Sequence, residues 1–314
     1  MIETTRIDKT LDTIPKLLLD HAKRRGDRPA NRHKNFGIWQ SWTWSEVAKE
    51  VRNLACGLAK LGFKRGDKLA VIGDNRPRLY WSMVAAQALG GIPVPLYQDS
   101  VAEEMVYVLE NSDAKFAIVQ NQEQTDKLLE IKDRLPHLEY ICYEEPRGMR
   151  AYTEEFIFYY KDIQQTGRAF HGENPDYFLR EVENGQGSDI SIFLYTSGTT
   201  GKPKGVVLTQ ENLLITSRNS LAFDNITAEE EALAYLPMAW VGDNLFSFAQ
   251  AYVAGFCVNC PEGPETVMTD LREIGPTYYF APPAIYEAVL TKVMIRMEDA
   301  GKIKRLMFNY FMDL

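Results

Sequence analysis

The chain has 314 residues, of which 45% are hydrophobic and 25% charged, and its net charge is -8 at neutral pH. This composition is ordinary for a globular protein, and the length suffices for one large or two medium domains. The negative net charge argues against general nucleic-acid binding, which needs a basic surface to neutralise phosphates.

The start of the chain and its apolar runs indicate neither secretion nor membrane insertion. Residues 1–18 lack a basic stretch followed by an apolar core. The most apolar runs, 83–97 and 245–260, are interrupted by Gln, Gly or Pro and fall short of the about 20 residues that a membrane span needs. We therefore expect a cytoplasmic protein, and peripheral contact with a membrane is compatible with this expectation.

Residues 43–143 predict alternating helices and strands. Thr43–Glu46 is a capping box, and apolar residues follow it at helical spacing up to Gly62. A second capping box, Ser100–Glu103, is expected to open a later helix. Strands separated by helices indicate a mostly parallel sheet with helices on both faces. The expected strands are 68–73, 91–97, 115–120 and 138–143, and the other expected helices are 79–89 and 124–134.

Residues 144–188 differ from the rest because they are polar and rich in glycine. We expect only one or two short elements there and interpret the segment as a connection between two α/β subdomains, residues 1–188 and 189–314. Alternation then resumes, so the predicted fold is two doubly wound, mostly parallel sheets. The expected strands are 191–196, 205–209, 231–237, 255–260 and 277–282, and the expected helices are 210–222, 245–254, 265–274 and 283–300.

Four cysteines are too few for a disulfide framework in a chain of this length. Cys257 and Cys260 form a single CxxC, but all four histidines lie elsewhere in the sequence. On a strand, a spacing of three points the two thiols to opposite faces. We therefore expect buried or half-buried cysteines and no metal site.

The loop between strands 191–196 and 205–209 is the segment with the clearest chemistry. Glycines allow backbone N–H groups to turn toward an anion, hydroxyls add donors, and lysines add charge for a polyphosphate. The spacing differs from the P-loop, Rossmann and kinase patterns. The alternative is a flexible hairpin loop with solvated lysines. The predicted phosphate-binding residues are Thr196, Ser197, Gly198, Thr199, Thr200, Gly201, Lys202, Lys204 and Gly205.

The string "YTSGTTGKPKG" resembles, residue for residue, the phosphate-loop signature of the adenylate-forming superfamily. This superfamily includes acyl-CoA ligases, luciferases and peptide-synthetase adenylation domains. The resemblance extends over essentially the whole chain, and several segments look like the N-terminal part of a long-chain fatty-acyl-CoA synthetase. These segments include "TWSEVAKEVRNLACGLAKLGFKRGDKLAVIGDN", "GGIPVPLY", "AYLPMAWVGDN" and "FAPPAIYEAVL".

The resemblance implies a two-step reaction. A carboxylate attacks the α-phosphate of ATP, which forms an acyl-adenylate and pyrophosphate, and coenzyme A then displaces AMP. The implied ligands are therefore ATP with Mg²⁺, a fatty acid and coenzyme A, and no nucleic acid. An aromatic or short acid is an alternative substrate, and a shortened, non-catalytic protein that binds lipid or a partner is an alternative of another class.

The segment after the loop carries the expected substrate pocket, at Trp240, Val241, Gly242 and Asp243. Many relatives have a His where this chain has Trp240, so an imidazole role is absent here. A bulky gate for an apolar tail is one interpretation, and a core tryptophan at the end of a strand is the other.

Relatives continue further than this chain and carry an adenine-binding segment, a hinge and a mobile domain with a catalytic lysine. We therefore expect no catalytic residue before Leu314, and we expect the chain to be an N-terminal portion with weak nucleotide binding and little activity alone.

Overall fold

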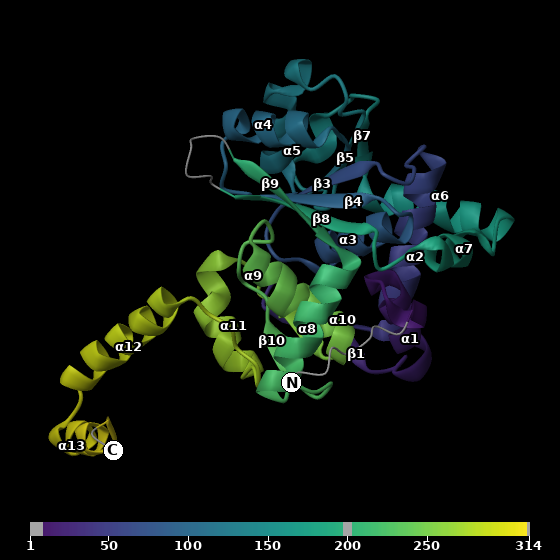
Figure 1. Ribbon diagram of the computed structural model, residues 1–314. Helices are drawn as coiled ribbons and strands as arrows, with labels where there is room; N and C mark the ends of the chain where they lie inside the picture. The colour runs from purple at the N-terminus through teal and green to yellow at the C-terminus, as the bar shows by residue number, and fades with distance from the viewer. Residues whose placement is uncertain (1–8, 197–202, 313–314) are drawn as a thin grey trace. The chain divides into compact units, whose positions relative to one another are not determined.

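A computed structural model describes residues 9–196 and 203–312 of the chain (Figure 1). The chain divides into two compact units, Met1–Tyr278 and Tyr279–Leu314. The first unit contains the sheets. The second contains the helices α12 (Pro283–Glu298) and α13 (Lys302–Met312).

A parallel five-stranded sheet forms one part of the first unit, with the strand order β4-β3-β5-β6-β7. Counted along the chain, this is the order 2-1-3-4-5 of flavodoxin-like, doubly wound folds. Such sheets bind ligands beyond the carboxyl ends of their strands, where the winding reverses, which is between β3 and β5 here. The strands are β3 (Lys68–Ile72), β4 (Ile92–Leu96), β5 (Ala114–Val119), β6 (Tyr140–Tyr143) and β7 (Ile157–Tyr159).

Helices cover both faces of this sheet, as the alternating sequence predicted (Figure 1). Successive residues of a strand point to opposite faces. Leu69 and Val71 therefore enter one core with α2, α3 and α6, while Ala70 and Ile72 enter a second core with α4 and α5. The α/β fold class is thereby confirmed. The helices are α2 (Trp44–Lys60), α3 (Pro77–Ala88), α4 (Ala102–Ser112), α5 (Gln122–Glu130) and α6 (Tyr160–Glu173).

A second sheet joins segments far apart in the sequence, in the order β10-β11-β1-β2. Strand β1 (Pro29–Asn35) pairs parallel with β11 (Cys257–Cys260) and antiparallel with β2 (Ile38–Thr43). Strand β10 (Glu231–Leu233) forms the other edge. This sheet combines both sides of the expected boundary at residue 188, and the division into 1–188 and 189–314 stays a prediction.

The remaining helices of the first unit pack around these sheets. They are α1 (Ile14–Arg24), α7 (Tyr177–Asn184), α8 (Gln210–Asp224), α9 (Val241–Asp243), the π-helix Asn244–Ala249, α10 (Gln250–Ala254) and α11 (Val267–Ile274).

One predicted capping box is confirmed and the other is wrong. The Thr43 hydroxyl accepts from Glu46 N, and the Glu46 carboxylate accepts from Thr43 N at 2.8 Å. Helix α4 begins at Ala102 instead, with Val101 at its N-cap and no side-chain cap. Ser100 N donates to Tyr97 O at 3.2 Å, so Ser100 belongs to a turn that precedes the helix.

The segment 144–188 contains more structure than predicted, because β7, α6 and α7 all lie in it. Helix α6 packs closely on α2 through two glycines. A Cβ at Gly167 would lie 1.7 Å from Asn53 O, and one at Gly57 would lie 2.2 Å from Ile163 O. The glycines that led us to predict a connecting segment therefore include one, Gly167, that permits a close helix crossing.

The predicted strand 277–282 is wrong, since only an isolated parallel bridge joins Tyr278 to Ala232. Pro282 ends this stretch, and Pro276 and Pro283 flank it, so strand pairing cannot extend at either end because proline cannot donate to a ladder of hydrogen bonds.

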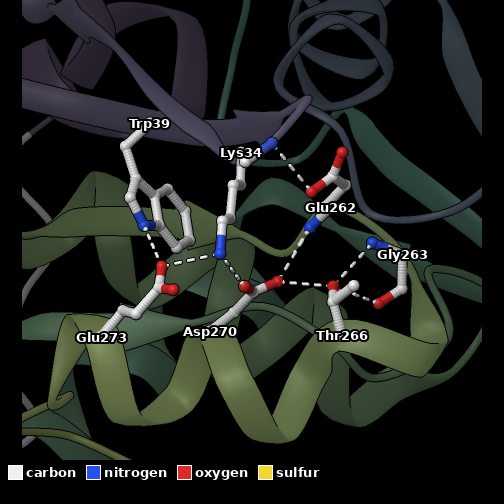
Figure 2. A network of polar contacts seen from close by, with 8 residues as sticks. Lys34, Trp39, Glu262, Gly263, Thr266, Asp270 and Glu273 are labelled. Carbon is white, nitrogen blue, oxygen red and sulfur yellow. Dashed lines mark hydrogen bonds and ion pairs between the residues drawn. The ribbon is translucent and has the colours of Figure 1, made fainter.

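A polar network ties the β1–β2 hairpin to α11 (Figure 2). Lys34 Nζ lies 2.8 Å from Asp270 Oδ1 and 2.7 Å from Glu273 Oε2. Trp39 Nε1 donates to the same Glu273 oxygen at 3.0 Å. Asp270 is fully buried and also accepts from the Thr266 hydroxyl at 2.6 Å. This network links chain positions 236 residues apart.

Candidate functional site

The predicted phosphate loop connects the two strands of an antiparallel hairpin. Strands β8 (Ile190–Thr196) and β9 (Lys204–Thr209) pair so that Thr196 faces Lys204 and Tyr195 faces Gly205. Thr196, Lys204 and Gly205 are exposed. The hairpin thus presents a hydroxyl and an ammonium side by side to solvent. The other predicted phosphate contacts, Ser197, Gly198, Thr199, Thr200, Gly201 and Lys202, lie outside the described residues.

Tyr195 anchors this end of the hairpin to the five-stranded sheet. Its ring is buried in the core between the five-stranded sheet and the helices α4 and α5, and its hydroxyl donates to Asn111 Oδ1 at 2.8 Å. Burial raises the pKa of this phenol, so it stays protonated as a donor. A Cβ at Gly205 would lie 3.4 Å from the Tyr195 ring, an ordinary van der Waals distance, so the ring alone does not require glycine at this position. Tyr195 is the first residue of the signature string, and the sequence pattern predicted no role for it.

A small cavity of about 40 Å³ lies beside Tyr195. It brings together the end of β4, the start of α4, the hairpin and Ala239, which directly precedes the four predicted pocket residues. The cavity is lined by Pro95, Leu96, Tyr97, Ser100, Glu104, Met105, Val108, Tyr195 and Ala239. The structure therefore places Ala239 next to the phosphate-loop hairpin, whereas Trp240, Val241, Gly242 and Asp243 do not line this cavity.

The four predicted pocket residues have different exposures. Trp240 is half-buried, Val241 is 48% exposed, and Gly242 and Asp243 are buried. A Cβ at Gly242 would lie 2.3 Å from the Trp240 ring, so the indole lies over this glycine. Only glycine at position 242 leaves room for that ring position.

Asp243 lies in a buried polar network, with 0% of the residue exposed. The Tyr80 hydroxyl donates to its two oxygens, at 2.8 and 3.0 Å. Asn75 Nδ2 lies 3.1 Å from Asp243 Oδ1. Burial raises the pKa of Asp243 to about 7, although hydrogen bonds from Tyr80, Ser247 and Asn75 partly oppose the rise. A carboxyl of this kind changes protonation near neutral pH.

Asn75 is a site residue that sequence reasoning missed. It also donates to Tyr80 Oη at 2.7 Å and to Leu236 O at 2.9 Å. A signal was present, because Asn75 follows the predicted strand 68–73, and residues at the carboxyl ends of parallel strands often line ligand sites. Its neighbour Asp74 is held there by the amide side chains of Gln98 and Gln120, at 3.2 Å each.

The described ranges 9–196 and 203–312 hold no group of three or more His, Cys, Asp or Glu side chains that could bind a metal ion. No helix in these ranges is both long and apolar enough to cross a membrane. Cys257 and Cys260 are buried free thiols, and burial raises the pKa of both.

The sequence matches one protein family over most of its length. Residues 18–309 match the family described as AMP-binding enzyme. A long-chain-fatty-acid–CoA ligase of Rattus norvegicus, ACSBG1, is 27% identical over 310 residues, which are 96% of this chain and 42% of that protein. The long chain acyl-CoA synthetase 3 of Arabidopsis thaliana is 26% identical over 283 residues, 87% of this chain and 41% of that protein. The chain therefore spans about two fifths of the length of these relatives.

Solved structures share the fold. A long-chain-fatty-acid-CoA ligase from Archaeoglobus fulgidus, FadD1, aligns with a TM-score of 0.75 at 16% identity and covers 96% of this chain and 57% of that one. The anthranilate CoA ligase AuaEII in complex with anthranoyl-AMP aligns with a TM-score of 0.74 at 19% identity, over 89% of this chain and 51% of that one.

Proposed function

This chain belongs to the AMP-binding enzyme family, as its loop signature predicted, and from this premise we propose that it is the nucleotide- and acid-binding part of an ATP-dependent fatty-acid–CoA ligase. The reaction would activate a long-chain fatty acid through an acyl-adenylate and transfer the acyl group to coenzyme A, with release of AMP and pyrophosphate. The observation that carries this proposal is the β8–β9 hairpin, in which Thr196 and Lys204 form the last residue pair before the signature loop.

The hairpin would bind the phosphates of ATP. Thr196 and Lys204 would act with residues 197–202 and Gly205 as donors and cations toward the β- and γ-phosphates. Such preorganised donors stabilise the charge that develops on departing pyrophosphate. Mg²⁺ would arrive with ATP and supply positive charge that offsets the charge of the phosphates, since this ion is usually held by substrate phosphates and a few carboxylates.

Residues 240–243 and the cavity beside Tyr195 would form the acid pocket. Trp240 is large, apolar and partly exposed, which suits contact with an alkyl chain. Coenzyme A would enter in the second step, and the catalytic lysine would come from the part of the relatives that this chain does not span. We propose a cytoplasmic enzyme that makes peripheral contact with a membrane.

Calorimetry with MgATP on the 314-residue chain tests the nucleotide site. We expect weak binding that Thr196→Val and Lys204→Ala each reduce further, by about tenfold, because each loses a hydrogen bond or ion pair to phosphate. Lys60→Ala is the matched control, since Lys60 is an exposed lysine at the end of α2. Equal affinity in all four proteins would contradict the phosphate assignment.

Substrate class is tested by pyrophosphate release with palmitate, benzoate, anthranilate and butyrate. The assay needs this chain extended by the region that its relatives possess. Faster release with palmitate supports the fatty-acid proposal, whereas preference for an aromatic or short acid replaces it. Efficient thioester formation by the 314-residue chain alone would overturn the expectation that the catalytic lysine lies elsewhere.

A further inference from the structure

The buried network of Asn75, Tyr80 and Asp243 connects the two parts of the fold that carry the proposed site. Asn75 follows β3 of the five-stranded sheet, Tyr80 lies on α3, and Asp243 ends α9. Their exposed fractions are 7%, 3% and 0%. Because Asp243 has no exposed surface, its hydrogen bonds stabilise the arrangement of the surrounding protein segments, and its carboxyl group does not contact a bound ligand.

These contacts hold residues 236–244 at both ends. Asn75 Nδ2 donates to Leu236 O at 2.9 Å, where the segment begins, and lies 3.1 Å from Asp243 Oδ1, near its end. The Tyr80 hydroxyl adds a second bond to Asp243 at 2.8 Å. Both ends are therefore fixed to groups that belong to the β3–α3 region.

The middle of the segment is held by its last residue, Asn244. Asn244 Nδ2 donates to Met238 O at 2.7 Å and to Trp240 O at 2.9 Å. Trp240 N also donates to Pro237 O at 2.9 Å. Since these bonds satisfy carbonyls on both sides of Ala239, the backbone there has one defined course.

Ala239 is the point at which this fixed segment meets the proposed site. It lines the same cavity as Tyr195, whose neighbour Thr196 begins the phosphate loop. A shift of the segment would therefore move Ala239 relative to Tyr195 and change the shape of the cavity between them.

We propose that Asn75, Tyr80 and Asp243 are positioning residues that fix residues 236–244 as one wall of the carboxylic-acid pocket. This inference rests on the proposed function, since it assigns the acid to this wall and ATP to the hairpin. A network with a purely structural role would weaken binding of both ligands equally when it is broken. A positioning network lowers affinity for the acid and leaves MgATP binding unchanged.

Tyr80→Phe is the test variant, because it removes one hydroxyl and keeps the ring that stacks on Phe248, with centroids 5.9 Å apart. Tyr160→Phe is the matched control. Tyr160 is also fully buried, and its hydroxyl donates to Arg78 O at 3.3 Å. Asn75→Ala is a second test variant, which releases Leu236 O as well as Asp243.

The first measurement is amide hydrogen exchange in the 314-residue chain without ligand. We expect exchange in residues 236–244 to be about tenfold faster in Tyr80→Phe and Asn75→Ala than in the wild type, because a lost buried bond lowers the free energy of local opening. Exchange in β9 and α8 should stay the same, and Tyr160→Phe should leave 236–244 unchanged. Exchange in 236–244 that matches the control in both test variants would overturn the positioning role.

The second measurement compares two ligands on the same chain, palmitate by equilibrium dialysis and MgATP by calorimetry. We expect palmitate binding to weaken about tenfold in both test variants while MgATP binding is unchanged. An equal loss for both ligands would overturn the proposal in favour of a structural role. If the wild type binds MgATP but not palmitate, the acid assignment fails. If it binds neither, the proposed function fails too, and the exchange result separately decides whether the network orders residues 236–244.

Discussion

Asp243 is a fully buried residue with a titratable side chain, so its protonation state affects the free energy of unfolding as well as the proposed function. A buried carboxylate loses its hydration, and burial is the main cause that raises the pKa of Asp243 to about 7. The neighbouring Tyr80 and Cys260 also have raised pKa values, so both remain protonated across the acidic and neutral range. Asp243 is therefore the group of this network that titrates near neutral pH.

We expect Asp243 to destabilise the native state as pH rises. A carboxyl with a pKa of about 7 when folded and about 3.9 when unfolded contributes stability that is complete below pH 4 and lost as pH rises to 7. The loss is about 4 kcal/mol if the whole shift is realised. Asp243→Asn cannot titrate, so urea unfolding of both proteins at pH 5, 6, 7 and 8 isolates the effect. Parallel pH dependences in the two proteins would contradict it.

The Lys34–Asp270 pair has the opposite pH dependence. Burial alone would raise the pKa of Asp270, but hydrogen bonds from Lys34, Thr266 and the amide of Glu262 outweigh it and hold this pKa below its ordinary value (Figure 2). A lowered pKa contributes stability that is present above the unfolded value, about 3.9, and lost as pH falls through the folded value.

We expect Lys34→Met to lower the melting temperature at pH 7, because it leaves the fully buried Asp270 carboxylate without its cation. The variant should also lose less stability than the wild type when pH falls below 4. The control is Lys127→Met, which breaks an ion pair with the exposed Glu123. Thermal melts at pH 7 and pH 3.5 give both comparisons, and similar melting temperatures for Lys34→Met and Lys127→Met would exclude this role of the pair.

At the scale of elements, the crossing of α2 and α6 depends on two glycines. Gly57 and Gly167 have no side chains that would hold the two helices apart, and each faces backbone atoms of the other helix. Tyr160 and Ile163 of α6 complete the contact in the same core as Val51 and Leu54 of α2. The crossing covers one face of the five-stranded sheet.

Gly167→Ala should destabilise the protein by about 3 kcal/mol or more, because its Cβ would lie 1.7 Å from Asn53 O and neither backbone can yield easily. Gly172→Ala in the same helix has no atom within 4 Å of the added Cβ and should be neutral or stabilising by at most about 1 kcal/mol. Urea unfolding of both variants measures the difference. Equal stabilities would mean that the helices separate at little cost.

At the scale of the whole molecule, the two units differ in how they bury apolar surface. Both apolar cores of the described chain draw on residues up to Tyr278. Over their described residues, α12 and α13 contain no buried side chain. Large apolar side chains are exposed there, at Tyr286, Leu290, Val293, Met294, Ile295, Ile303, Leu306, Met307, Tyr310, Phe311 and Met312. Natural monomers rarely expose such a group.

A chain that ends at Tyr278 should unfold cooperatively, because it keeps the whole of the first compact unit, and it should aggregate less because it lacks these exposed apolar side chains. A chain that ends at Ala254 is the control, because it lacks β11, which joins β10 to β1. This control should not unfold cooperatively. Thermal melts followed by circular dichroism, with light scattering, test both expectations. A non-cooperative melt for the chain ending at Tyr278 would show that the first unit does not fold without the rest of the chain.

The sequence by itself determined the fold class, the family and most strands of the five-stranded sheet, because hydrophobic periodicity and the loop signature are local properties of the chain. It could not predict β1, whose residues "PANRHKN" are largely polar and which pairs on one side with β11, more than 200 residues away. Glycines in 144–188 indicated a connection between subdomains, whereas Gly167 permits a helix contact that could be predicted only with knowledge of α2.

The tertiary structure alone decided how the candidate site is organised. The pattern selected Asp243 and passed over Asn75, Tyr80 and Tyr195, because no local signal shows that residues 75, 80 and 243 meet in one buried network. Burial and hydrogen bonding between distant segments set the pKa of Asp243 and hold the segment 236–244, whose Ala239 lines the cavity beside Tyr195. These properties depend on contacts across the fold, and so they follow from the packing of the chain and not from the spacing of its residues.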